Sequence, residues 1–357
     1  MLTRIVNLLK WLKKLSFDSK RNILFLLIDF LSLKRKKTVS RLEYQNYKMY
    51  AKSKDFREGF LSYAGACKYW TLLNPLQNAC LARNKFLSHC LLESVQIPKS
   101  ELYVYYNPEL SHVEDYFAND YNSVKNILLN KKISTFVVKP ASDSAHGEGV
   151  FICKKVKFLE DDCFLIKQDG TLISLKKLLG KVSLLFEELI IQSSQMMSLN
   201  SSSVNTIRIM TALFPEGEVR TIAAFIKIGR KGSEIDNAGN GGNIDCGVEI
   251  NSGRLFNAVE FNSWSDIRNI SSHPDSGAIL ENVEIKDWLS IRKQVEIYQA
   301  KIPFLKTIGW DVAITEKGPL IVEINNWWDT TGQLFINRGW EQQIQECYKA
   351  WSLYYQK

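Results

Sequence analysis

Short apolar runs separated by turn-like sequences dominate the chain from about residue 135 onward. The segments 135–140 and 184–190 are rich in β-branched, aromatic and other large apolar residues, which favour β-strands. The segments 206–214 and 219–228 have the same character and flank Pro215-Glu216-Gly217-Glu218, a turn by composition. Because short turns join antiparallel neighbours, the pattern predicts a mostly antiparallel sheet in the second half of the chain.

The chain before residue 135 is predicted to be mainly helical. Residues 56–102 have apolar residues at helical spacing, with Lys85 near the start of one helix and Pro98 just after its end. An extended stretch follows at 102–106, and a further amphipathic segment runs to about residue 129. Helices followed by strands in this order predict an α+β fold.

Two strands near the C-terminus, residues 309–315 and 320–325, are predicted to form a hairpin with three oxygen ligands on one face. Folding the chain about position 317 places Asp311 opposite Glu323. Asn325 lies on the same face, because side chains alternate along a strand. Two carboxylates and an amide carbonyl suit Mg²⁺. Solvated acids on a surface hairpin are the plainer interpretation, but apolar neighbours favour buried strands whose charges need a cation.

A second candidate for anion chemistry is the strand that ends at Lys139. It leads into a loop of serine and glycine at 140–150 and then into another strand. Backbone N–H groups of such a loop can face phosphate oxygens, while the lysine supplies a positive charge. The order is strand, loop, strand, so this is not a P-loop that leads into a helix.

Composition limits the classes of protein that remain. At 357 residues, with 45% hydrophobic and 24% charged side chains, the chain is long enough for two or three globular domains. The seven cysteines are scattered without a CxxC pair, which argues against a disulfide scaffold or a zinc site and favours a reducing cytoplasm. The four histidines are far apart in sequence, so histidine-based metal or triad chemistry has no support.

Positive charge is concentrated at the N-terminus. Residues 1–40 carry ten basic and two acidic side chains, a net charge of +8 that equals the formal charge of the whole chain. A basic amphipathic helix suits the surface of an anionic membrane, although a helix that docks on its own protein explains the pattern equally well. The apolar run 23–33 is too short to span a bilayer, and nucleic acid is a weaker choice of partner. The residues of the predicted helix are Leu8, Leu9, Trp11, Leu12 and Leu15 on one side and Lys10, Lys13 and Lys14 on the other.

The order of these parts resembles the ATP-grasp superfamily, and in detail the sugar-transfer-associated ATP-grasp branch, also described as related to alpha-L-glutamate ligases. The resemblance covers roughly residues 55–340. It rests on Phe136-Val137-Val138-Lys139-Pro140, Phe186-Glu187-Glu188-Leu189-Ile190, Ser203-Val204-Asn205-Thr206-Ile207-Arg208-Ile209, Asp236-Asn237 with Gly241-Gly242, Gly309-Trp310-Asp311-Val312-Ala313, and Glu323-Ile324-Asn325.

The resemblance implies an ATP-grasp fold in which two α+β subdomains clasp ATP. Glu187 would then contact the adenine amino group, helped by the backbone of the residues that follow it. Lys139, Lys85 and loop N–H groups would bind the phosphates, and Asp311, Glu323 and Asn325 would hold Mg²⁺. The nucleotide-binding set implied in this way is Lys85, Lys139, Ser144, Gly147, Gly149, Glu187, Glu188 and Ile190.

The resemblance also implies catalytic and substrate-binding residues. Arg208, together with Lys139, would stabilise charge on the transferred phosphoryl group; a structural ion pair is the alternative role for Arg208. Lys227 and Arg230 would bind phosphate or an acidic acceptor, and ordinary strand-edge cations are the alternative there. The full substrate set implied is Asn205, Lys227, Arg230, Asp236, Asn237, Gly241 and Gly242.

The implied function is an ADP-forming ligase that uses ATP and Mg²⁺ to join a carboxylate and an amine, modifying a sugar or amino acid in cell-surface polysaccharide synthesis. It would act in the cytoplasm, and peripheral attachment to the inner face of the plasma membrane stays open. A phosphotransferase and a non-catalytic nucleotide-binding regulator of glycan assembly stay open as alternatives. The expected parts are a basic amphipathic segment (1–50), a helical domain (51–130), a small ATP-grasp subdomain (131–190) and a large one (191–357).

Overall fold

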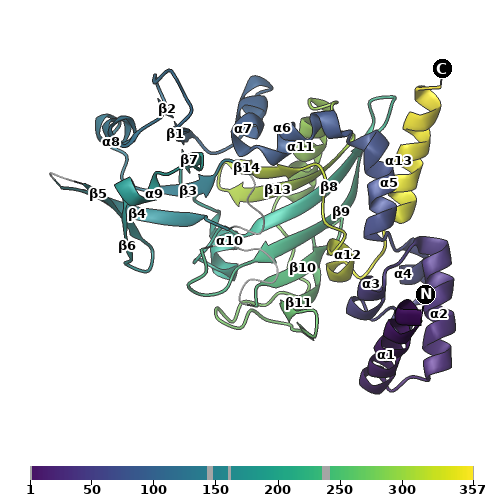
Figure 1. The fold of residues 1–357 in the computed structure, drawn as a ribbon. Coiled ribbons are helices and arrows are strands. Elements are labelled where there is room, and N and C mark those ends of the chain that lie inside the picture. Colours follow the sequence, from purple (N-terminus) through teal and green to yellow (C-terminus); the bar gives the residue numbers. More distant parts are fainter. Residues whose placement is uncertain (1, 143–147, 160–161, 235–241, 357) are drawn as a thin grey trace. The chain divides into compact units, whose positions relative to one another are not determined.

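The computed structural model describes residues 2–142, 148–159, 162–234 and 242–356 (Figure 1). Contacts divide the chain into two compact units. One unit combines Met1–Leu73 with Asp329–Lys357, and the other is Asn74–Trp328. The finer division expected from the sequence stays a prediction. Of the helices described, none is both long and apolar enough to cross a membrane.

The first unit is helical, and its N-terminal helices meet around aromatic rings. Trp11 lies with its ring centroid 5.0 Å from that of Phe30 and 6.0 Å from that of Tyr44, both edge-on. Asn22 accepts two backbone N–H groups where the second helix begins, and Ser40 forms a capping box at the start of the third. The helices are α1 (Leu2–Ser19), α2 (Ile23–Lys37), α3 (Arg41–Asn46), α4 (Lys54–Gly59), α5 (Tyr63–Leu73), α12 (Gly332–Phe335) and α13 (Glu341–Tyr354), with a 3₁₀ turn at Met49–Ala51.

The second unit contains a sheet of seven strands in the order β2-β1-β7-β3-β4-β5-β6. One of its faces is apolar: Phe136, Val138 and Phe186 are fully buried there with Val124 and Leu128 of α8. The strands are β1 (Leu102–Tyr106), β2 (Phe117–Ala118), β3 (Phe136–Pro140), β4 (Phe151–Phe158), β5 (Cys163–Lys167), β6 (Leu172–Ser174) and β7 (Leu184–Glu187), and the helices are α8 (Tyr121–Asn130) and α9 (Leu175–Leu178).

A second seven-stranded sheet has the order β12-β11-β10-β9-β8-β13-β14, and every neighbouring pair is antiparallel. The antiparallel prediction and the α+β class are therefore confirmed. Its strands are β8 (Thr206–Leu213), β9 (Val219–Ile228), β10 (Ile244–Val248), β11 (Leu255–Ser263), β12 (Asp266–Asn269), β13 (Thr307–Thr315) and β14 (Gly318–Asn325). The remaining helices of the unit are α6 (Cys80–Arg83), α7 (Lys85–Ser94), α10 (Ser194–Leu199) and α11 (Trp288–Ala300), with a 3₁₀ turn at Leu76–Asn78.

The two faces of the second sheet differ in chemistry because side chains alternate along each strand. On one face Ile207, Ile209 and Val312 are fully buried and share a core with α11. The intervening residues Arg208 and Asp311 are paired directly across β8 and β13, so both point to the opposite face. The strands thus present charged side chains on the face that the hydrophobic core leaves uncovered.

Candidate functional site

The C-terminal hairpin has the register expected from the sequence. Asp311 pairs with Glu323, and Gly309 pairs with Asn325. The turn itself is only Glu316-Lys317, because β13 ends at Thr315 and β14 begins at Gly318. A bulge next to Asp311 adds one residue to β14, since Val312 pairs with Ile321. A shorter turn and one extra residue together give the predicted pairing.

Asp311 is surrounded by hydrogen-bond donors. Arg208 binds both of its oxygens, with Nε at 2.7 Å from Oδ1 and an Nη at 2.9 Å from Oδ2. Lys227 Nζ lies 3.0 Å from Oδ1, and the Asn325 amide nitrogen lies 3.4 Å from Oδ2. Burial alone would raise the pKa of Asp311, but the charges of Arg208 and Lys227 outweigh burial and hold that pKa well below its usual range. The Asp311 carboxylate is therefore ionised and already neutralised.

Glu323 is more accessible and faces the start of α7. Its carboxylate lies 3.4 Å from Lys85 Nζ, and its side chain is 36% exposed. Asn84 caps α7 by accepting the N–H of Leu87. The backbone N–H of Lys85 donates to the carbonyl of Ala141, 2.7 Å away, just after β3 ends. The helix start is thus tied to the strand that carries Lys139.

Lys139 and Glu187 form an ion pair on the first sheet. Lys139 Nζ lies 2.7 Å from Glu187 Oε2, and Ser100 Oγ donates to the same carboxylate oxygen at 2.7 Å. Glu187 is 6% exposed. Val137 pairs with Glu187 across β3 and β7, so Lys139 projects from the same face two residues along. The ionic partner that a lysine on an apolar strand requires is this glutamate.

Two residues that the sequence did not single out lie beside this pair. Lys99 Nζ is 2.7 Å from His89 Nε2, and Glu93 approaches both within 4 Å. Burial, with Lys99 beside it, lowers the pKa of His89 to about 4, so the neutral imidazole accepts a hydrogen bond from Lys99. Lys99 directly follows Pro98, which the sequence marked only as a helix stop.

The residues at the end of β7, which were predicted to recognise adenine, already form a hydrogen bond within the protein. The N–H of Glu188 donates to the carbonyl of Glu101 at 2.8 Å, while the Glu188 side chain is exposed. Ile190 is half-buried just beyond the end of β7. These contacts hold the segment after β7 against the segment before β1.

The predicted phosphate loop is described only at its ends. Ser144 and Gly147 lie outside the described residues. Gly149 has a φ of +75°, and a Cβ built there would lie 2.9 Å from Cγ of Pro140. Glycine is therefore required at this position by both backbone conformation and space.

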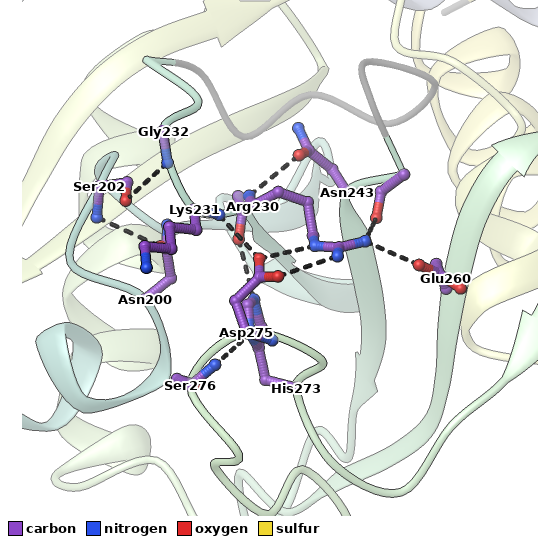
Figure 2. A network of polar contacts seen from close by, with 12 residues as sticks. Asn200, Ser202, Arg230, Lys231, Gly232, Asn243, Glu260, His273, Asp275 and Ser276 are labelled. Carbon is purple, nitrogen blue, oxygen red and sulfur yellow. Dashed lines mark hydrogen bonds and ion pairs between the residues drawn. The ribbon is translucent and has the colours of Figure 1, made fainter. Parts of the chain in front are cut away.

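Arg230, predicted to bind substrate, forms an internal network of ion pairs (Figure 2). It donates to both oxygens of Asp275, at 2.7 and 2.9 Å, and to Glu260 at 2.7 Å. It also donates to the carbonyl of Gly242 at 3.3 Å. The paired Arg230 guanidinium holds the pKa of Asp275 well below its usual range. Arg230 thereby anchors the end of β9 to β11, to the loop after β12 and to the chain before β10. Asp236, Asn237 and Gly241 lie outside the described residues.

Asn205 is also bound within the protein. It is fully buried, its amide nitrogen donates to the carbonyls of Met196 and Asn200 at 2.8 and 2.9 Å, and its oxygen accepts the N–H of Gly229 at 3.4 Å. These bonds connect α10 to the end of β9. A role for Asn205 in substrate binding stays a prediction.

The brought-together charges form two groups. In the first group, around β13 and β14, Lys85 pairs with Glu323 while Arg208 and Lys227 pair with Asp311, and strand register places Asp311 opposite Glu323. In the second, on the first sheet, Lys139 pairs with Glu187. Among the described residues, no three acidic, histidine or cysteine side chains gather as a metal cage requires. A hollow of about 460 Å³ lined by residues of β2 and α8 contains none of the predicted site residues.

Comparison with known proteins gives one family. The family model described as sugar-transfer associated ATP-grasp matches residues 66–349. No curated protein matches the sequence.

Solved structures of similar arrangement share little sequence with the chain. N5-carboxyaminoimidazole ribonucleotide synthetase from Thermotoga maritima is 13% identical, with a TM-score of 0.42, over 81% of this chain and 56% of that one. Biotin carboxylase from Campylobacter jejuni is 9% identical, with a TM-score of 0.45, over 76% and 46%. D-alanine–D-alanine ligase from Bacillus anthracis is 14% identical, with a TM-score of 0.39, over 79% and 70%. The chain spans about half the length of the first two.

Proposed function

Because the chain belongs to the sugar-transfer-associated ATP-grasp family, we propose that it is an ATP- and Mg²⁺-dependent ligase that joins a carboxylate to an amine and releases ADP. The observation that carries this proposal is the set of partly buried cations that face carboxylates. Lys85, Lys139 and Arg208 each lie within 3.5 Å of an acidic oxygen. Buried cations of this kind supply the charge that phosphoryl transfer needs.

ATP is proposed to bind along the face that carries Lys139 and Glu187. Glu187 is held by Lys139 and Ser100 through one oxygen, Oε2, and its carboxylate would accept the adenine amino group. The backbone of Glu188 and Ile190 would complete this contact. Lys85 and Lys139 would meet the phosphates, with backbone N–H groups of the loop that includes Ser144, Gly147 and Gly149.

Mg²⁺ is proposed to bind Asp311, Glu323 and Asn325, and the donor chemistry fits this ion. A carboxylate has about four acceptor positions, and Arg208, Lys227 and Asn325 occupy four at Asp311. Coordination by Asp311 therefore requires one donor to leave. A half-turn of the Asn325 amide would remove its nitrogen and present its oxygen instead.

The proposed reaction needs no nucleophile from the protein. Bound ATP would supply the phosphoryl group that activates the acid as an acyl phosphate, with release of ADP; the amine would then attack the acyl carbon and displace phosphate, forming the amide. Arg208 is held by Asp311 in a fixed orientation, so its guanidinium is positioned before charge develops on the transferred group. Lys227, held by the same carboxylate, would neutralise the acidic acceptor or phosphate.

The acceptor is proposed to be a sugar or an amino acid used in cell-surface polysaccharide synthesis, with the protein in the cytoplasm at the inner face of the plasma membrane. The family description supports the link to sugar transfer. Arg230, Asp236, Asn237, Gly241 and Gly242 would form the acceptor side; for Arg230 the role would be to position the strand end through Asp275 and Glu260.

The proposal is tested by incubating the purified protein with ATP, Mg²⁺ and pooled amino acids and uronic acids while ADP, AMP and phosphate are measured. ADP formation that requires both an acid and an amine supports the ligase. ADP formation with a phosphorylated acceptor and no need for an amine identifies a phosphotransferase. Tight ATP binding without turnover for any pair identifies a nucleotide-binding regulator.

The metal assignment is tested by Glu323→Gln. We expect this variant to lose at least about 100-fold in turnover, because an ionised ligand is removed. The matched control is Glu284→Gln, which removes an exposed glutamate paired with Arg254 at 3.2 Å and should keep full activity. Full activity of Glu323→Gln would remove Glu323 from the metal site.

A further inference from the structure

The first unit exposes a row of large apolar side chains on its N-terminal helices. On α2, Leu24, Ile28 and Leu31 are 63%, 61% and 49% exposed. Their spacing of four and three residues places them on one side of the helix. We call these three the outer apolar surface; on α1, Ile5, Val6 and Leu9 are also exposed, at 51%, 42% and 48%.

This surface differs from the apolar side that the sequence predicted. Leu12 and Leu15 of α1 are buried, and Trp11 packs edge-on against Phe30 while its indole N–H donates to Gln45 at 2.9 Å. Trp11, Leu12 and Leu15 of the predicted side therefore belong to the internal core of the unit, whereas Leu9 is exposed. The outer apolar surface is what remains after that core is complete. Both helices are apolar on two sides, and only one side has a partner among the described residues.

Basic side chains border this surface at the ends of α2. Lys20 and Arg21 precede the helix and are exposed, as are Lys34, Arg35 and Lys36 in its last turn. The acidic side chain within α2, Asp29, is engaged inside the unit by Arg57 and by the hydroxyl of Tyr44. Its charge is therefore compensated, and the charge presented around the apolar row is positive.

We propose that the outer apolar surface binds an anionic lipid bilayer, with α2 lying in the plane of the interface. Exposed leucine and isoleucine side chains would enter the acyl boundary while lysines and arginines meet anionic headgroups. A second copy of this chain is a poor occupant, because each copy brings the same positive charge to the contact. An anionic surface complements that charge.

Binding is tested by flotation of the full chain with vesicles of phosphatidylcholine, with and without phosphatidylglycerol. The first variant carries Leu24→Gln, Ile28→Gln and Leu31→Gln, and the second carries Lys34→Gln, Arg35→Gln and Lys36→Gln. We expect flotation only with the anionic vesicles, weakening with salt, and a loss on the order of 100-fold in affinity for either variant. The control carries Leu289→Gln, Ile297→Gln and Leu353→Gln, whose exposures of 57%, 48% and 63% match those of the α2 row, and it should float like the parent.

Several outcomes would overturn the proposal. The first is that the parent does not float with anionic vesicles. The second is that the first variant floats as well as the parent. The third is that the control variant loses as much flotation as the first variant. Concentration-dependent self-association that the first variant abolishes would assign the surface to a second copy instead. Because the replaced side chains are exposed, each variant should keep its helices, and circular dichroism checks this. Flotation is measured without ATP, so its outcome is separate from that of the ligase assay.

Discussion

At the scale of single residues, each buried charge of the candidate site costs free energy of folding, and its ion-pair partners offset that cost. Asp311 and Lys227 are 4% and 5% exposed, and the ion pairs of Asp311 with Lys227 and Arg208 offset the cost of burying these charges. Glu323 is half-exposed by comparison and has a longer contact with Lys85. Two residues assigned to the same metal ion should therefore differ in their effect on folding.

Asp311→Asn should lower the free energy of unfolding by about 3 to 5 kcal/mol, because it removes a buried carboxylate charge that pairs with two buried cations. Glu323→Gln should lower it by less than about 1 kcal/mol, since a partly exposed pair contributes little. Urea unfolding of both variants measures the difference. If both variants lost the same free energy of unfolding, the difference in burial between Asp311 and Glu323 would not determine their contributions to folding. That result would contradict the prediction.

His89 should make stability depend on pH. Its pKa falls from 6.5 to about 4 on folding, so the unfolded chain binds the proton more readily. The contribution of His89 is fully present above about pH 6.5 and is lost as pH falls toward 4, by up to about 3 kcal/mol.

Urea unfolding of the parent and of His89→Gln between pH 4 and 7 measures this effect. The difference in free energy of unfolding between the two proteins should change across that range, with the parent losing stability relative to the variant at low pH. His112→Gln, which replaces an exposed histidine, should follow the parent throughout. A difference for His89→Gln that stays constant with pH would contradict the prediction.

At the scale of elements, local pattern predicted the strands that carry the site and their register. Strand periodicity put Asp311 and Glu323 on one face, and the observed pairing agrees. The bulge in β14 was not predicted, because an extra residue leaves the alternation of Glu323 and Asn325 unchanged. Folding about position 317 gave the correct pairing of Asp311 with Glu323 only because two differences cancel. The turn is shorter than predicted, and the bulge adds one residue to β14.

Other elements depended on contacts that local pattern does not contain. The strands β10, β11 and β12 and the helices α11 and α13 were not predicted. The network of Arg230 joins residues 45 positions apart in sequence, so no spacing rule identifies Asp275 as its partner. Lys139 shows the reverse case: its need for an anionic partner was clear from its apolar strand, while the identity of Glu187 came from strand pairing.

The end of α4 meets the chain before α13 through two glycines. A Cβ added to Gly339 would lie 2.0 Å from the carbonyl carbon of Gly59, and backbone cannot move aside as a side chain can. Gly339→Ala should therefore lower the free energy of unfolding by more than about 2 kcal/mol. Gly180→Ala is the control, because nothing lies within 4 Å of its added Cβ. Thermal unfolding compares the two, and an unchanged Gly339→Ala protein would contradict this packing.

At the scale of the whole molecule, ligand binding and folding are linked in the unit that holds the site. ATP with Mg²⁺ at about 100 times its dissociation constant should stabilise that unit by about 2.7 kcal/mol, a rise of roughly 5 to 10 °C in its melting temperature. Lys139→Met should lose most of this rise, because the phosphates lose a positive charge. Differential scanning calorimetry with and without nucleotide measures it, and a full rise in the variant would remove Lys139 from the nucleotide site.

The division of the chain also determines how the two units are joined. Residues 74–328 are an insertion within the helical unit, which is built from both the earlier and the later parts of the chain. The polypeptide therefore crosses between the units twice, at 73–74 and at 328–329. A single proteolytic cut at either crossing would leave the other intact, so the nicked protein should remain one particle under native conditions. Only a second cut, at the remaining crossing, would release the inserted unit, whereas unfolding of the helical unit after one cut would free only the severed part of that unit.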